Sequence, residues 1–170
     1  MLEHQGEKFR ITSRLDIHGR YEVTLEKSQK YFISIGGAGG GGSVSGIYFD
    51  STNGERGEIM EGIVDKIAED LSVTIYVGKG GANGIANLLT PSCGADGESS
   101  SIEWKVGMET LKFEAKGGKG GSWVSIIDPY TRWCAYISDM ITMRSTIRSR
   151  DASPGEDGVV IFAEKVVDVV

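Results

Sequence analysis

The sequence predicts an all-β fold, a β-sandwich-like arrangement of antiparallel sheets whose strands are connected by glycine-rich segments. Three observations favour this fold class. Short runs of alternating apolar and polar residues recur along the chain, each about the length of a strand. Glycine accounts for 25 of the 170 residues, about twice the usual share of roughly 7 %. Three glycine clusters directly follow such runs at intervals of roughly 40 residues, which is typical of repeated supersecondary units.

Strands are expected where apolar side chains occupy every second position. In the run 111–115, leucine, phenylalanine and alanine alternate with lysine and glutamate, and the run 21–25 shows the same alternation. Successive side chains of a strand point to opposite faces, so apolar residues at every second position place one face of the strand against the core. The links are rich in Gly, Ser, Asn and Asp, as hairpin connections are. The predicted strands are 9–12, 21–25, 31–35, 45–49, 73–77, 100–104, 111–115 and 159–163.

The segment 59–71 is compatible with two kinds of secondary structure. Isoleucine or leucine recurs at every fourth residue from Ile59 to Leu71, which is also the pattern of one helix face. Gly62 interrupts this pattern, and the preceding residues Gly54 to Gly57 offer no good helix cap. We therefore predict a strand that is followed by a turn near residues 68–70.

The glycine clusters that follow strands are expected to belong to the fold. Because glycine has no Cβ, neighbouring backbones approach closely and exchange Cα–H···O contacts. Extended glycine segments in a left-handed three-fold helix, as in polyglycine II, stack in this way. Ordering glycine costs more backbone entropy than ordering any other residue, so tight packing has to offset it. The predicted structural glycines are Gly36, Gly37, Gly39, Gly40, Gly41, Gly42, Gly78, Gly80, Gly81, Gly117, Gly118, Gly120 and Gly121.

Motifs for cofactors, metals and catalysis are missing or lack their context. The run 37–42 matches the dinucleotide pattern G-x-G-x-x-G, but strand-like residues follow it where that site needs a helix. His4 and His18 are isolated in the sequence, and two cysteines, Cys93 and Cys134, form no metal-binding spacing and are expected to be free thiols. We therefore expect no cofactor, no metal and no catalytic residue. A carboxylate pair for glycoside hydrolysis stays open as an alternative, because acidic residues are scattered over the chain.

Charge and hydropathy limit the possible partners. The net charge of −6 disfavours nucleic-acid binding, which depends on lysine and arginine replacing counterions. A small basic cluster of Arg144, Arg148 and Arg150 is followed at once by acidic residues and is interpreted as a solvated loop. No stretch approaches the roughly 18 apolar residues of a membrane span, so no membrane insertion is expected. The N-terminus lacks the pattern of a signal peptide, which predicts synthesis in a cytoplasm.

The chain is expected to form one domain over 1–170, with a less glycine-rich insertion at 122–154. This insertion contains Tyr130, Arg132, Trp133 and Tyr136. Exposed aromatic side chains beside an arginine are typical of contact surfaces for carbohydrate or protein, so these four residues are the candidate receptor or partner contacts. The alternative is that the aromatic side chains fill the core beneath a long loop.

The order of these blocks resembles the glycine-rich domain of bacteriophage tail fibres, tail-tip adhesins and minor tail proteins. The most recognisable part is 57–81, which starts with Gly-Glu and ends with Val-Gly-x-Gly-Gly. The strand pair within 9–25 and the run 31–42 precede it, and 97–100, 111–121 and 155–161 continue the order. The resemblance also favours a strand over a helix for 58–64. The chain departs from the pattern in the insertion at 122–154 and after Ile161.

This resemblance implies a non-enzymatic virion component of the tail, fibre or baseplate, with a role in host receptor binding in some members. The alternative is a structural protein of the capsid surface, head fibre or collar. The implied partners are other copies of the same chain, with a trimer as one candidate, other virion proteins, and a host surface glycan or protein. The implied location is the virion, after synthesis in the host cytoplasm. Fold alone does not choose between these roles.

Overall fold

The computed structural model describes residues 1–41, 54–83, 94–120, 133–137, 141–146 and 156–166. Within these residues the chain forms β-strands and no helix, which confirms the all-β prediction. Consequently, no helix in this part of the chain has the length and apolar character to cross a membrane. The strands are β1 (Leu2–His4), β2 (Glu7–Leu15), β3 (Gly19–Leu25), β4 (Tyr31–Gly36), β5 (Ile59–Val64), β6 (Leu71–Val77), β7 (Ser100–Val106), β8 (Glu109–Ala115), β9 (Trp133–Ile137), β10 (Ile141–Thr146) and β11 (Val159–Lys165).

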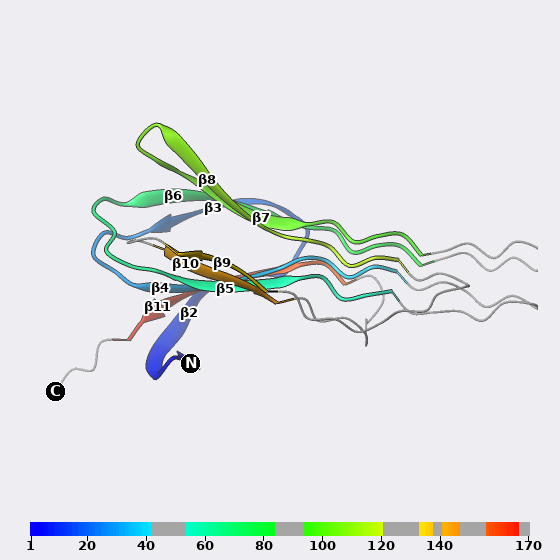
Figure 1. The fold of residues 1–170 in the computed structure, drawn as a ribbon, viewed down its shortest axis with the longest axis horizontal. Helices are drawn as coiled ribbons and strands as arrows, with labels where there is room; N and C mark the ends of the chain where they lie inside the picture. The colour runs from blue at the N-terminus through cyan, green and yellow to red at the C-terminus, as the bar shows by residue number, and fades with distance from the viewer. Residues whose placement is uncertain (42–53, 84–93, 121–132, 138–140, 147–155, 167–170) are drawn as a thin grey trace, which may run out of the picture.

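The strands form two antiparallel sheets that face one another as the layers of a sandwich (Figure 1). The larger sheet has the order β1-β2-β11-β4-β5-β10-β9, and the smaller sheet has the order β3-β6-β7-β8. Distant parts of the sequence meet in the larger sheet, where β11 lies between β2 and β4. In this register Val160 is opposite both Leu15 and Ile35. The sandwich therefore depends on pairing between residues far apart in the chain.

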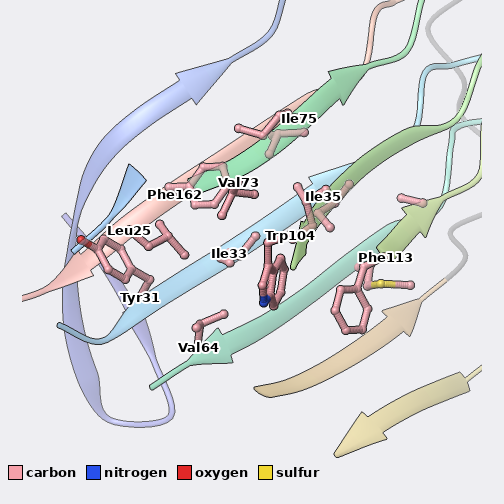
Figure 2. Packing of buried hydrophobic residues seen from close by; sticks show 14 of the residues in the cluster. Leu25, Tyr31, Ile33, Ile35, Val64, Val73, Ile75, Trp104, Phe113 and Phe162 are labelled. Atoms are coloured by element: carbon pink, nitrogen blue, oxygen red, sulfur yellow. The ribbon is translucent and has the colours of Figure 1, made fainter. Parts of the chain in front are cut away.

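Alternate side chains from the facing sides of the two sheets fill the core. β4 contributes Ile33 and Ile35 and β6 contributes Val73 and Ile75, all of them fully buried. Figure 2 shows these side chains in one layer with Trp104 of β7. Burying an aliphatic side chain of this size stabilises the fold by about 1.5–3 kcal/mol. The period-two pattern of the sequence is thus what joins the sheets.

The opposite face of the larger sheet is only partly covered. Phe9, Phe32 and Ala163 form a separate buried cluster there, and the His4 ring centroid lies 4.8 Å from that of Phe32. Farther along the same face, near the glycine ends of the strands, Ile59 and Ile161 are only half-buried. An apolar strip of this face therefore has no complete cover among the described residues.

β5 confirms the prediction of a strand at 58–64. Burial alternates along it, with Met60 and Val64 buried toward the core and Glu61 exposed between them. Residues four apart share a face on a strand as well as on a helix, so the spacing of Ile59 and Ile63 did not distinguish the two. The strand ends before Ile67, which lies beyond β5 and is buried as part of the main hydrophobic core.

Seven of the eight predicted strands are present, each within a longer or equal observed strand, while 45–49 lies outside the described residues. β1, β9 and β10 were not predicted. The interpretation of the basic cluster as a loop is wrong at Arg144, which lies in β10 opposite Glu61 of β5. The sequence alone did not place these two residues together. Arg148 and Arg150 lie outside the described residues.

Candidate functional site

Six segments extend side by side from one end of the sandwich, as Figure 1 shows. We call these segments together the glycine bundle. Three of them leave β4, β6 and β8, and the other three lead into β5, β7 and β11. In chain order they are 36–41, 54–58, 78–83, 94–99, 116–120 and 156–158.

Segment 36–41 is the centre of the glycine bundle and is hydrogen-bonded to the five other segments. Its N–H groups at residues 37, 38 and 39 donate to three different neighbouring segments. The N–H groups at residues 40 and 41 donate to the same segments as those at 37 and 38. A repeat of three residues is that of a polyproline II-type helix. The acceptors are the carbonyls of Glu58 for Gly37, Glu98 for Ala38, Glu156 for Gly39, Glu55 for Gly40 and Ala95 for Gly41, at 2.9–3.0 Å.

The five outer segments are also bonded to one another around this centre. Segment 54–58 bonds to 116–120, which bonds to 94–99, which bonds to 78–83, which bonds to 156–158. The bonds run from Glu55 N to Lys119 O, Glu58 N to Lys116 O, Gly97 N to Gly118 O, Ala95 N to Ala82 O, Glu98 N to Lys79 O and Gly158 N to Gly78 O, at 2.8–3.0 Å. An isolated helix of this type has no internal hydrogen bonds, so the bundle depends on lateral contacts.

The bundle requires glycine because its backbones are too close for a side chain. A Cβ at Gly37 would lie 2.1 Å from the Lys116 carbonyl oxygen, and one at Gly97 would lie 2.3 Å from that of Ala38. Real Cβ atoms essentially never approach another heavy atom below 3.0 Å. None of the described bundle glycines has a positive φ. Contact with neighbouring backbone, and not an unusual torsion, therefore excludes other residues here.

The segments that lead into strands contain glycines that sequence reasoning missed. In the bundle, glycines recur at every third residue, a spacing that was available in the sequence as a sign of a three-fold helix. Four of the five missed glycines are shown to sit against neighbouring backbone or side-chain atoms at 2.5 Å or less. The spaced pairs are Gly37 and Gly40, Gly54 and Gly57, Gly78 and Gly81, Gly94 and Gly97, and Gly117 and Gly120, and Gly158 is a further missed glycine.

Polar side chains fix the junction between the bundle and the sandwich. Asp157 accepts hydrogen bonds from the N–H of Gly80 at 2.8 Å and from the N–H of His18 at 3.1 Å. Glu98 accepts from the N–H of Lys79 at 3.0 Å and from the Tyr76 hydroxyl at 3.1 Å. Each carboxylate therefore ties an incoming segment to the outgoing segment after β6.

A family model described as a glycine-rich domain matches residues 16–159. The match begins just before β3, ends at the first residue of β11, and includes all six segments of the glycine bundle. The chain belongs to this glycine-rich domain family. A search of the curated proteins finds no match. The description of the family names no function.

The predicted contact residues of the glycine-rich domain are only partly placed. Trp133 and Tyr136 lie on β9, the edge strand of the larger sheet. Tyr130 and Arg132 lie outside the described residues, as do Gly42 and Gly121 of the predicted structural glycines. Cys134 also lies on β9, and Cys93 is outside the described part of the chain.

The described residues of the glycine-rich domain contain no group of three or more His, Cys, Asp or Glu side chains arranged to hold a metal ion. His18 is not isolated in space, although it is isolated in the sequence. Its Nδ1 lies 2.9 Å from the carbonyl oxygen of Val77 and 3.8 Å from Oε1 of Glu98, and its ring meets that of Tyr76 edge-on. These contacts join the residue before β3 to the end of β6 and to the bundle segment that contains Glu98.

The carboxyl group of Asp157 is expected to make stability depend on pH in the acid range. The Gly80 and His18 N–H groups hold the pKa of Asp157 below its ordinary value. Its contribution is therefore present above the unfolded-state pKa of about 3.9 and is lost as the pH falls through the folded-state pKa. We expect the free energy of unfolding of Asp157→Asn, measured by urea denaturation from about pH 6 to about pH 2, to fall less steeply with decreasing pH than that of the wild type.

The control for this prediction is Glu109→Gln, which removes an exposed carboxylate at the start of β8, far in the fold from the Asp157 hydrogen bonds. It is expected to leave the acid loss of stability as steep as in the wild type. Equal pH profiles for Asp157→Asn and the wild type would contradict the role given to Asp157.

Ser100 provides a second measurable anchor between bundle and sandwich. Its Oγ accepts a hydrogen bond from the N–H of Gly78 at 3.0 Å, and both residues are buried. Ser100→Ala leaves that buried N–H without this acceptor, so we expect the free energy of unfolding to fall by about 1–3 kcal/mol in urea denaturation. Ser101→Ala, at the next position of β7, is only half-buried and is expected to change it by less than about 0.5 kcal/mol. Similar losses in both variants would rule out the Ser100 anchor.

Proposed function

We propose that this glycine-rich domain is a non-enzymatic component of a bacteriophage virion, in the tail, fibre or baseplate. The observation that supports this role is the glycine bundle, a set of six laterally bonded segments that extends the β-sandwich from one end. Such a bundle suits a rigid spacer. The resemblance of the block order to tail-fibre and tail-tip domains supplies the phage setting.

The physical basis of the spacer role is lateral hydrogen bonding. A single extended glycine chain is flexible, with an end-to-end distance that grows only as about 5–6 Å times the square root of its length. Here each outer segment is bonded to the centre and to at least one outer neighbour. Bending the bundle would slide these backbones past one another and break bonds at several levels, so six weak segments act as one stiff element.

In this proposal, the domain assembles with other copies of itself and with other virion proteins, and it acts on the virion after synthesis in the host cytoplasm. The test is to locate the domain on purified particles of the phage that encodes it, using antibody labelling and electron microscopy. A position on the tail, fibre or baseplate supports the proposal. A position on the capsid or collar would favour the structural alternative, and absence from the particle would exclude both.

A contribution to host binding is proposed for Tyr130, Arg132, Trp133 and Tyr136. The support is chemical: aromatic side chains with an arginine are enriched where proteins make tight contacts. The test compares binding of the wild-type domain and its alanine variants at these positions to host cells and to a glycan array. Retention of full binding by Tyr130→Ala and Trp133→Ala would end this assignment. Met108→Ala, at a fully exposed turn position far from them in the sequence, is the control.

A further inference from the structure

In the part of the chain that the structure describes, the ring around the central segment 36–41 is open on one side. Rods that pack closely around a centre of equal width have six neighbours, and here five are bonded in sequence from 54–58 around to 156–158. No bond among the described residues joins these last two segments. Among the described residues, the ring therefore has one unfilled position, between 54–58 and 156–158.

A groove lies at this unfilled position. It has a volume of about 360 Å³ and combines bundle backbone with the uncovered strip of the larger sheet. Gly37 and Gly39 of the central segment line it, with Gly57 on one side and Glu156 on the other. Its floor continues over Ile59, Ser34 and Ile161 of β5, β4 and β11. The groove is thus a continuation of the bundle along an apolar sheet face.

The hydrogen bonding of the centre shows what the open position lacks. The three incoming neighbours accept N–H bonds from the centre, and the two outgoing neighbours donate to it, from Gly118 to Ala38 O and from Gly81 to Gly39 O. Donating and accepting neighbours alternate around the ring. By this alternation, the sixth position belongs to a segment that donates to the centre. The carbonyls of Ala38 and Gly39 already have donors, so the carbonyl left in the three-residue repeat is that of Gly37. No backbone N–H of the described residues donates to this carbonyl.

We propose that the groove binds an extended glycine-rich strand of a partner protein, which runs parallel to segment 36–41 and donates a backbone N–H to Gly37. The two equivalent positions hold 78–83 and 116–120, which read Gly-Lys-Gly-Gly-Ala-Asn and Lys-Gly-Gly-Lys-Gly and so combine glycine with lysine. At these positions a Cβ on Gly81 or Gly117 would lie within 2.0 Å of a neighbouring carbonyl oxygen. If neighbouring backbones are as close at the open position, it accepts only a strand that has glycine at every third residue, where a Cβ would clash.

The source of the strand follows from the occupancy of the bundle. A second copy of the chain already holds its own outgoing segments 36–41, 78–83 and 116–120 in its own bundle. Because the glycine segments of the described residues all have a place in the bundle, we assign the occupant to a different polypeptide. Glu156 and Asp157 on one side of the groove outnumber Arg56 on the other, which favours a strand with lysine at its non-glycine positions, as in Lys-Gly-Gly-Lys-Gly-Gly at 116–121. This proposal does not depend on the phage setting.

The test is a titration of the ¹⁵N-labelled full chain with the capped peptide Lys-Gly-Gly-Lys-Gly-Gly, followed by NMR. Saturable shifts are expected at Gly37, Gly39 and Ile161. A matched peptide with alanine in place of each glycine is expected to bind at least about tenfold more weakly, because its Cβ atoms would overpack the groove. Absence of saturable shifts, or equal affinity for the two peptides, would overturn the proposal.

Three tryptophan variants of the protein locate the binding. Ser34→Trp fills the groove and is expected to abolish the shifts, whereas Ser101→Trp places the same ring on the outward face of the smaller sheet and is expected to retain them. Both serines are half-buried strand residues, so the pair is matched for its effect on folding, and Ile161→Trp serves as a second groove variant. Equal binding by Ser34→Trp and Ser101→Trp would refute the site.

Other occupants give different results. A dimer that dissociates in Ser34→Trp but not in Ser101→Trp would assign the groove to a second copy. Contacts in NMR between Gly37 and residues 147–155 of the same chain, together with no peptide binding, would assign it to the chain itself. Either result would overturn the proposal of a partner strand.

Discussion

Gly37→Ala is expected to lower the free energy of unfolding by about 3 kcal/mol or more, because it inserts a methyl group between backbones in contact. The new Cβ would meet the carbonyl oxygen of Lys116 at 2.1 Å and that of Ala115 at 2.8 Å. Both are backbone atoms, and the Lys116 oxygen also accepts a hydrogen bond from the N–H of Glu58, so neither moves away as a flexible side chain would. The centre of the bundle then has to shift, and its bonds to the outer segments lengthen together.

The matched control is Gly36→Ala, one residue earlier. Its Cβ would lie 3.4 Å from the carbonyl oxygen of Val159, with no closer contact. Gly36 also ends β4, where alanine is allowed by the torsions. We expect a change of at most about 1 kcal/mol by urea denaturation. Comparable losses in the two variants would show that the bundle does not need close backbone contact.

Trp104→Ala is expected to lower the free energy of unfolding by about 3–5 kcal/mol, through the cavity it leaves in the core. The side chain is 2 % exposed, and its ring centroid lies 5.6 Å from that of Phe113 on the neighbouring strand. Figure 2 shows it reaching into the layer that the two sheets share. Its loss therefore weakens both the contact between the sheets and the pairing of β7 with β8.

Trp104→Phe separates packing from hydrogen bonding in this result. The buried Nε1 of Trp104 has no hydrogen-bond partner among the described residues, and an unsatisfied buried donor costs about 1–3 kcal/mol. Phenylalanine removes that donor and keeps most of the ring, so we expect a net loss of less than about 1.5 kcal/mol. Met108→Ala, at a fully exposed turn position, is expected to change stability by less than about 0.5 kcal/mol. A loss for Trp104→Phe as large as that for Trp104→Ala would mean that the indole N–H has a partner.

The strands of the fold were largely predictable, because burial on one face of a sheet imposes a period of two on the local sequence. The run 111–115 illustrates this: Phe113 and Ala115 are buried, and Lys112 and Glu114 are exposed. β1 and β9 were missed because they are short strands at the two edges of the larger sheet, where packing dictates the sequence less strongly. The site was predictable only in part, since the outgoing glycine runs are conspicuous and the single glycines of the incoming segments are not.

By itself, the sequence determined that the chain forms alternating strands and that glycine stacks its backbones, since both follow from local spacing. Only the tertiary structure decided which segment lies at the centre of the bundle and which position around it is open. The bond from Gly80 to Asp157 joins residues 77 positions apart, and β11 enters the larger sheet between β2 and β4. Such pairings depend on the order of strands in the sheets. That order is set by the packing of whole faces and leaves no trace in a local repeat.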